Sequence, residues 1–224
     1  MKKLYYAFIA ATLCTLLLSC KNTKAPVSEK IVYTEPEAID MGLSVKWANC
    51  NLGADTPEGF GVYLAWGETE MKAGYSEDNY KWYSTPFNKT KYNWDESKGV
   101  VDSLYLLTPE DDAAIVYLGQ PWRIPNHQDW EELAMNSDWE WTERNGVPGM
   151  EVTSKINGNQ LFFPAAGGFQ GKKVEDKMKM GGYWTSELAD SGPEWPYCLL
   201  FGNYWLEMSA SMYCFWGFSI RPVQ

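Results

Sequence analysis

Histidine is almost absent from this sequence of 224 residues, and His127 is its only copy. A catalytic triad or a general base that used imidazole would therefore have to be built on this one side chain. Its place in the first turn of a predicted surface helix also fits an ordinary helix-terminal residue. We expect His127 to be such a residue, and we predict no catalytic residues.

Cysteine is also scarce. The chain has five, and three of them, Cys50, Cys198 and Cys214, lie beyond the N-terminal region. No Cys-x-x-Cys pair occurs, so the spacing typical of a structural zinc site is missing. Each of the three lies in an apolar, strand-like run, which favours buried free thiols. A disulfide between Cys198 and Cys214 remains the alternative, because an exported protein can form one.

Positive charge is in short supply. The chain has 19 basic and 29 acidic residues, a formal charge of −10. Removal of an N-terminal signal with Lys2 and Lys3 leaves 17 basic residues, and the charge becomes −12. An acidic surface is repelled by nucleic acid and by anionic lipid. We therefore expect no nucleic-acid partner, and contact with a membrane only through an attached lipid.

One long hydrophobic run occurs, at 4–18, directly after two lysines. It is shorter than the roughly 20 residues that span a bilayer, which is typical of an export signal. The ending Leu17-Leu18-Ser19-Cys20 resembles the lipobox of bacterial lipoproteins. That resemblance implies cleavage before Cys20, lipidation there, and an outer-membrane location on the periplasmic or the external face. An ordinary cleaved signal is the alternative.

The remaining chain divides into a tether and one domain. Residues 20–36 are rich in Lys, Asn, Thr, Pro and Ser without apolar periodicity, which is typical of a flexible linker. Residues 37–224 are numerous enough to bury one large core. We therefore predict a signal peptide at 1–19, a lipidated tether at 20–36 and a single domain at 37–224.

Two helices are predicted. In the segment 121–133 an extended stretch with Trp122 and Ile124 leads into Asn126, a helix N-cap, and Trp130 and Leu133 follow at the spacing of one buried stripe. Thr108, followed by Pro and two acids, predicts the start of another helix that ends at Gly119.

Alternating apolar residues and turn signals predict strands in most of the rest. The expected strands are 41–47, 63–68, 139–142, 150–153, 160–163, 181–186, 197–201 and 216–223. Turns are expected at Asn145-Gly146 and Asn157-Gly158, and 172–179 is expected to be a solvated turn. Residues 70–100 contain many aromatics without any period, which predicts a long ordered loop pinned by its rings, or one that carries function.

Several motifs, in order from about residue 39 to 224, resemble the Fibrobacter succinogenes major paralogous domain family. They are Met41–Ala54, Ala65–Thr69, Trp122–Pro125 with Trp130–Leu133, Phe163–Gly167, Tyr183–Ser186 and Gly217–Val223. The family is common on exported lipoproteins of gut Bacteroidota and is similar to C-type lectins. The resemblance implies an α+β fold in which two helices pack on a small twisted antiparallel sheet with long irregular loops. It implies no agreed biochemical activity.

Related folds also suggest chemistry that this sequence lacks. Some lectin-like folds bind calcium through Glu-Pro-Asn, Gln-Pro-Asp and Trp-Asn-Asp loops, and none of these tripeptides occurs here. The related formylglycine-generating enzymes use a closely spaced cysteine pair, whereas Cys198 and Cys214 are sixteen positions apart. We therefore predict no metal and no cofactor.

Charged residues inside the motifs allow two further interpretations. Arg123 and Arg221 lie in apolar segments, so we expect them to be buried or half-buried structural residues paired with acids such as Glu68 or Glu131. Binding of a ligand carboxylate is the alternative role. Glu68, Glu131 and Glu132 could also supply the paired carboxylates of a glycan hydrolase, which stand about 5–9 Å apart.

The aromatic residues of the C-terminal end carry the functional prediction. Rigid rings interleaved with small hydrogen-bonding residues are typical of binding surfaces, and we expect this set on loops between Glu187 and Phe215. The predicted ligand-binding residues are Trp195, Tyr197, Asn203, Tyr204, Trp205, Glu207 and Tyr213. Packing of these rings in the core and its rim is the alternative. The predicted function is adhesion or binding, without catalysis, to a glycan or to a host or bacterial surface protein.

Overall fold

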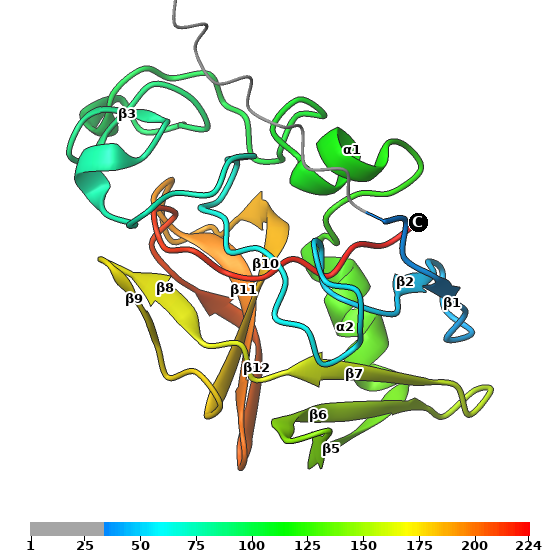
Figure 1. Ribbon diagram of the computed structural model, residues 1–224. Helices are drawn as coiled ribbons and strands as arrows, with labels where there is room; N and C mark the ends of the chain where they lie inside the picture. The colour runs from blue at the N-terminus through cyan, green and yellow to red at the C-terminus, as the bar shows by residue number, and fades with distance from the viewer. Residues whose placement is uncertain (1–33) are drawn as a thin grey trace, which may run out of the picture. The chain divides into compact units, whose positions relative to one another are not determined.

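The computed structural model describes residues 34–224 (Figure 1). Its helices are α1 (Ala113–Leu118) and α2 (His127–Met135), with the 3-10 turns η1 (Glu77–Asn79) and η2 (Glu96–Lys98). Its strands are β1 (Ala38–Ile39), β2 (Trp47–Ala48), β3 (Tyr83–Thr85), β4 (Asn88–Lys89), β5 (Ser137–Arg144), β6 (Val147–Ser154), β7 (Gln160–Pro164), β8 (Gly168–Gln170), β9 (Lys173–Glu175), β10 (Met180–Leu188), β11 (Pro196–Gly202) and β12 (Trp205–Ser211).

The predicted α+β class is confirmed, because two α-helices accompany small antiparallel sheets within 34–224. The signal peptide at 1–19, the lipidation of Cys20 and nearly all of the tether fall outside the described residues. In the described part of the chain, neither helix has the length and hydrophobicity that a membrane span requires.

The second predicted helix begins where its sequence indicates. The Asn126 side chain accepts from the Asp129 backbone N–H at 2.8 Å, and the Asp129 carboxylate accepts from the Asn126 N–H at 2.7 Å. This reciprocal cap satisfies two N–H groups that the first turn leaves free. Trp130 and Leu133 are fully buried, so the predicted apolar stripe of α2 is also confirmed.

The meander β5-β6-β7 forms as its turn signals predict. β5 and β6 pair over eight residues around the Asn145-Gly146 turn, and β6 pairs with β7 around the loop that contains Gly158. Trp139 and Phe163 point to the same face and stack with centroids 5.6 Å apart. This face covers one side of what we call the body core.

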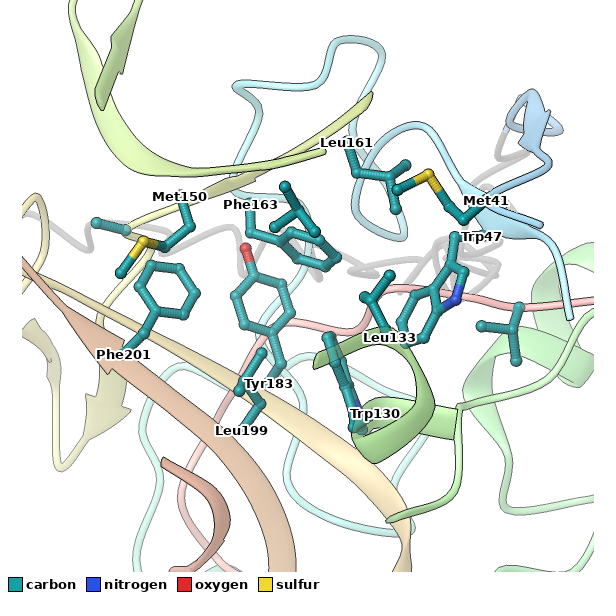
Figure 2. Packing of buried hydrophobic residues seen from close by; sticks show 13 residues of the cluster. Met41, Trp47, Trp130, Leu133, Met150, Leu161, Phe163, Tyr183, Leu199 and Phe201 are labelled. Carbon is teal, nitrogen blue, oxygen red and sulfur yellow. The ribbon is translucent and has the colours of Figure 1, made fainter. Parts of the chain in front are cut away.

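The body core lies between α2, the β5-β6-β7 sheet and the β10-β11-β12 sheet. Figure 2 shows the ring of Tyr183 between Phe201 and Trp130, with centroids 6.0 Å away on both sides. Its buried members are Met41, Trp47, Trp130, Leu133, Met150, Val152, Leu161, Phe163, Ala165, Tyr183, Leu199, Phe201 and Val223.

The β10-β11-β12 sheet separates this core from a second one. Neighbouring residues of a strand point to opposite faces, so Tyr183 enters the body core while Trp184 enters the other. Cys198 and Leu199 divide in the same way on β11. The second cluster, which we call the loop core, lies under residues 70–100, the long loop, drawn in green at the top of Figure 1. Its buried members are Ala65, Trp66, Tyr75, Tyr80, Tyr92, Trp184, Leu188, Cys198, Cys214, Phe215 and Phe218.

The long loop is ordered by its rings, as one of the two interpretations expected. Tyr75, Tyr80 and Tyr92 are each no more than 2 % exposed. The Tyr80 hydroxyl donates to the Trp66 carbonyl at 2.8 Å, and the Trp66 indole donates to the Thr185 carbonyl at 2.8 Å. Side chains thus supply the hydrogen bonds that a helix or sheet would otherwise provide.

Some predicted element bounds are wrong. The segment 41–47 bends at Gly42, which has φ +74°, and only Trp47–Ala48 is strand. In 63–68 and 216–223 the expected strands reduce to isolated bridges, among them Leu64 with Phe218.

Two further bounds differ from the prediction. The first helix begins at Ala113 and not after Thr108, because the Asp112 carboxylate caps it by accepting from the N–H groups of Ala114 and Ile115. Strand β9 lies inside the segment expected to be a solvated turn.

The end of the chain returns to the sheets, as expected. Val223 bridges both Trp47 and Arg123, and Ser219 bridges Tyr183 on β10. Lys46 and Gln224 exchange two backbone hydrogen bonds, of 2.8 and 2.9 Å. The first described strands and the C-terminus therefore lie side by side (Figure 1).

Candidate functional site

The seven residues predicted to bind a ligand do not form one surface. Strands β11 and β12 form a β-hairpin in the middle of the segment 187–215, where display loops were expected. Tyr197 pairs with Ser211 at one end of this hairpin, and Gly202 pairs with Trp205 at the other. At about 3.4 Å per residue, these ends are on the order of 17 Å apart. Tyr197 and Trp205 therefore lie at opposite ends of the hairpin.

Trp195 and Tyr213 do come together, beside the loop core. Their ring centroids are 4.0 Å apart, and Tyr213 stacks on Phe215 at 5.0 Å and 16°. Phe87 of the long loop lies 6.0 Å from Tyr213 and 6.2 Å from Phe215. We call these four rings the aromatic stack. Trp195 and Tyr213 are half-buried and Phe87 is 38 % exposed, so one side of the stack faces solvent.

Phe87 reaches the stack through a strained turn. It follows Pro86 between β3 and β4 and adopts φ +61°, the left-handed conformation. For a residue with a Cβ this costs roughly 1–2 kcal/mol. Such strain persists where the surrounding structure fixes the residue, and it is concentrated at functional sites. Here it holds a large ring over Tyr213 and Phe215.

Two lysines of the long loop fix the segment that carries Trp195. Lys89 is fully buried, and its ammonium donates to the Pro193 carbonyl and, at 3.2 Å, to the Tyr92 carbonyl. Lys98 forms an ion pair with the buried Glu194. Burial lowers the pKa of Lys89, and the nearby Cys214 and Glu194 oppose that shift. Burying an ammonium costs several kcal/mol, so its hydrogen bonds must hold this segment firmly.

Tyr197 lies in a different setting, against α2. The His127 ring stacks on it at 4.5 Å and 19°, and His127 Nε2 is 2.9 Å from the Ser209 hydroxyl. Glu131 is 3.9 Å from the same nitrogen. His127 is thus more than a helix-terminal residue, because it joins α2 to β11 and β12.

The hairpin tip holds Asn203, Tyr204 and Trp205. Tyr204 is 93 % exposed and Trp205 is 47 % exposed. The Trp205 indole lies over Gly202, where a Cβ would come within 2.5 Å of its nitrogen. Glu207 is exposed two residues further along β12. This tip can contact a partner, but it is separate from the aromatic stack.

A pocket of about 610 Å³ adjoins the stack and shares Phe215 with it. Its other lining residues come from the long loop and from the β8–β9 hairpin. They are Tyr75, Ser76, Glu77, Gln170, Gly171, Lys172, Lys173 and Glu175. This volume falls within the range of small-molecule sites.

The three described cysteines are buried free thiols, as predicted, and Cys198 and Cys214 form no disulfide. Burial raises the pKa of both thiols. The Tyr83 hydroxyl is 3.4 Å from Cys214 Sγ. A buried thiol with a raised pKa is a poor nucleophile, and Cys198 and Cys214 pack in the loop core.

Arg221 is buried and Arg123 is half-buried, within the predicted range, but their partners differ from Glu68 and Glu131. Arg123 forms a bidentate pair with Asp129 of the α2 cap, at 2.6 and 3.1 Å. Arg221 is fully buried and has no acidic partner among residues 34–224. Its guanidinium donates to the Asn51 side chain at 2.9 Å and to the carbonyls of Ala48 and Phe162, and it lies 4.4 Å from the Phe163 ring centroid.

The motif carboxylates each have their own neighbours. Glu68 accepts from Lys72 and from the Lys81 N–H, Glu131 lies near His127, and Glu132 accepts from Ser44. Among residues 34–224, no group of three or more His, Cys, Asp and Glu side chains is arranged to hold a metal ion.

Sequence reasoning missed Phe87, Lys89 and the pocket. The Pro86-Phe87 pair between short strands was a turn signal, yet nothing in it indicated contact with residue 213. Lys89 gave no signal at all, because a lysine in a charged loop is normally solvated. Phe215 marks the end of the segment expected to carry the site, and it is not among the seven predicted ligand-binding residues.

Comparison of this chain with known protein families, with characterised proteins and with solved structures finds no match.

Proposed function

We propose that this chain is a lipid-anchored binding protein with a C-type-lectin-like domain, and that it recognises a glycan or a surface protein without catalysis. The class of fold supports this proposal, since two helices and small antiparallel sheets carry a long loop, and Trp47, among the first described residues, bridges Val223 near the C-terminus. Residues of the family-like motifs, such as Trp66, Trp130 and Arg221, are buried. The resemblance therefore concerns the scaffold, which leaves the exposed loops free to carry specificity.

One observation carries the binding proposal: the aromatic stack is partly exposed and rigidly supported. Aromatic side chains bury a large area at little entropic cost, so they serve as anchors for ligands. The buried Lys89 and the Lys98–Glu194 pair fix the segment below Trp195 before any ligand arrives. A site fixed in advance loses less entropy on binding.

Arrays of glycans and of surface proteins, probed with the full chain in detergent, test this proposal. Trp195→Ala and Tyr213→Ala should each weaken binding by at least about 2 kcal/mol, or roughly 30-fold. Tyr105→Ala is the control, because Tyr105 is a 50 % exposed ring that stacks on Trp94, outside the aromatic stack. Equal losses in all three variants, or turnover of a glycan, would contradict the proposal.

The lipid anchor rests on the sequence around Cys20, outside the described residues. We propose that Cys20 is lipidated and tethers the domain to the bacterial outer membrane. A Cys20→Ala chain should leave the detergent phase in a phase-separation assay. Retention of that variant in the membrane fraction would contradict the anchor.

A further inference from the structure

The pocket beside the aromatic stack is built from three segments that are distant in the sequence. Tyr75 and Phe215 line it with the small exposed edges of their rings, which are 2 % and 6 % exposed, and both belong to the loop core. Gln170 to Glu175 of the β8–β9 hairpin form a second side, and Ser76 and Glu77 complete the rim. Two rings beside a polar rim make a site of the composition that small-molecule ligands use.

The two walls of this pocket are joined firmly. Tyr75 and Gly171 exchange backbone hydrogen bonds of 2.7 and 2.8 Å, and the Tyr75 hydroxyl donates to the Tyr63 carbonyl. A Cβ on Gly74 would come within 2.8 Å of the Gly171 carbonyl oxygen, so the walls approach as closely as backbone allows. The pocket is therefore present before a ligand binds.

The charges on the rim balance. Lys173 and Glu175 pair at 2.9 Å. Lys172 and Glu77 make no ion pair with any residue of 34–224, so both are available to a ligand. Two cations and two anions leave the rim neutral, within a chain of formal charge −10. This balance disfavours an acidic ligand.

We infer that this pocket binds an uncharged pyranose unit of a glycan, whose chain continues over the aromatic stack; this rests on the proposed binding function. A sugar ring has an apolar face of C–H groups, which suits Phe215 and Tyr75. Its hydroxyls both donate and accept, which suits the amide of Gln170, the carboxylate of Glu77 and the ammonium of Lys172. Because Phe215 belongs to both the pocket and the stack, one oligosaccharide can occupy both.

Calorimetric titration of the full chain in detergent tests this inference. The uncharged probes are gluco-, manno-, galacto- and xylo-oligosaccharides of six units, and the acidic probes are hexagalacturonate and a heparin fragment. At least one uncharged probe should bind, and the acidic probes should bind at least tenfold more weakly. Glu77→Gln and Gln170→Ala should each lower the affinity roughly tenfold, because each removes a hydrogen bond to the sugar.

Gln170→Trp should abolish binding by filling the pocket. Gln160→Trp is its matched control, because Gln160 is also an exposed strand glutamine but lies on β7. A melting curve for each variant shows whether it is folded. Loss of affinity at Gln170 with unchanged affinity at Gln160 supports the inference.

Three results separate this inference from the proposed function. If an uncharged glycan binds and its affinity depends on Trp195 but not on Gln170, the pocket is not the sugar site, while the proposed binding function is retained. Preference for the acidic probes, or a protein ligand on the stack with no glycan bound, would lead to the same conclusion. Failure of every glycan and protein to bind would overturn both.

Discussion

The tryptophans of the two cores are used differently. In the body core Trp47 and Trp130 lie 4.6 Å apart, and neither their indole N–H groups nor that of the adjoining Trp139 has a partner within the described residues. In and around the loop core, the indoles of Trp66, Trp82 and Trp184 donate to main-chain carbonyls at 2.8, 3.0 and 2.8 Å. Trp216, at the edge of the loop core, is the exception.

This difference follows from the secondary structure that surrounds each core. Around the body core, regular strands and a capped helix satisfy their own backbone hydrogen bonds. The tryptophan rings there only fill space in the hydrophobic core. The long loop has few regular elements, and the indoles in and around the loop core donate to carbonyls of the segments beside it, those of Leu64, Gly67 and Thr185. Order there depends on specific polar contacts between residues such as Trp66 and Thr185, 119 positions apart. We expect the loop half to be the more sensitive of the two to loss of a hydrogen bond.

Alkaline pH should have the largest effect on this contrast. Burial raises the pKa of Tyr75, Tyr80, Tyr83 and Tyr92 in the loop half, and of Tyr183 to about 12 in the body. When the pKa of a tyrosine is higher in the folded than in the unfolded state, its stabilising contribution is fully present below about pH 10, the unfolded pKa. That contribution is lost as the pH rises from there to the folded pKa. The loss is at most about 1.4 kcal/mol per pH unit for each tyrosine.

Four of these tyrosines lie in or against the loop core, and one lies in the body core. We therefore expect the region around the loop core to unfold locally before the body core does. Hydrogen exchange between pH 10 and 12 should show earlier loss of protection in residues 70–100 than in β5–β7. Simultaneous loss in both, with tyrosine ionisation followed by ultraviolet absorbance, would show that the two halves are one cooperative unit.

A matched pair of substitutions should show the next largest difference. Trp130→Phe and Trp66→Phe remove similar volume from fully buried positions. Only Trp66→Phe leaves a buried carbonyl, that of Thr185, without its donor. We expect Trp66→Phe to cost about 1–3 kcal/mol more in unfolding free energy. Urea denaturation measures both, and equal values would remove the proposed distinction.

Arg123→Ala should cost about 1–3 kcal/mol, because it leaves the buried carboxylate of Asp129 without its cation. Asp129 still accepts from the Asn126 N–H, and Arg123 is itself one-third exposed, so the value should stay below that of a fully buried pair. Thermal melting with Arg123→Lys as the control measures this. Unchanged melting with lost ligand binding would make Arg123 a ligand residue.

Tyr204→Ala should have the smallest effect on stability, within about 0.5 kcal/mol, because the ring is 93 % exposed at the hairpin tip. Its effect on binding discriminates between the two candidate surfaces. If Tyr204→Ala weakens ligand binding as much as Trp195→Ala, the tip and not the aromatic stack is the contact surface.

The sequence predicted the elements whose signals are local. The Asn126 cap, the Asn-Gly turns and the alternating pattern of β5 to β7 each depend on a few neighbouring residues, and they form as expected. Strand β12 also has a local signal, since Leu206, Met208 and Ala210 alternate with exposed residues. The aromatic residues around it favour a loop, and a loop is the prediction for this segment.

The candidate site was less predictable because it depends on distant contacts. Trp195 and Tyr213 were predicted and do meet, yet Phe87 joins them from more than a hundred positions away. The pocket needs Tyr75, Gly171 and Phe215 together, and no local pattern links these three segments. A sequence pattern specifies neighbours along a strand or helix, whereas this site lies between segments.

Hydrogen exchange of the full chain, with and without a saturating uncharged oligosaccharide, tests the central claim most directly. If the body is the scaffold and the loop half carries the site, added protection will be confined to residues near 75–77, 170–175 and 213–215. Amides of β5, β6 and β7 will exchange as in the free chain. Protection centred on the β5-β6-β7 sheet or on the tip at Tyr204, with none around Phe215, would contradict the account.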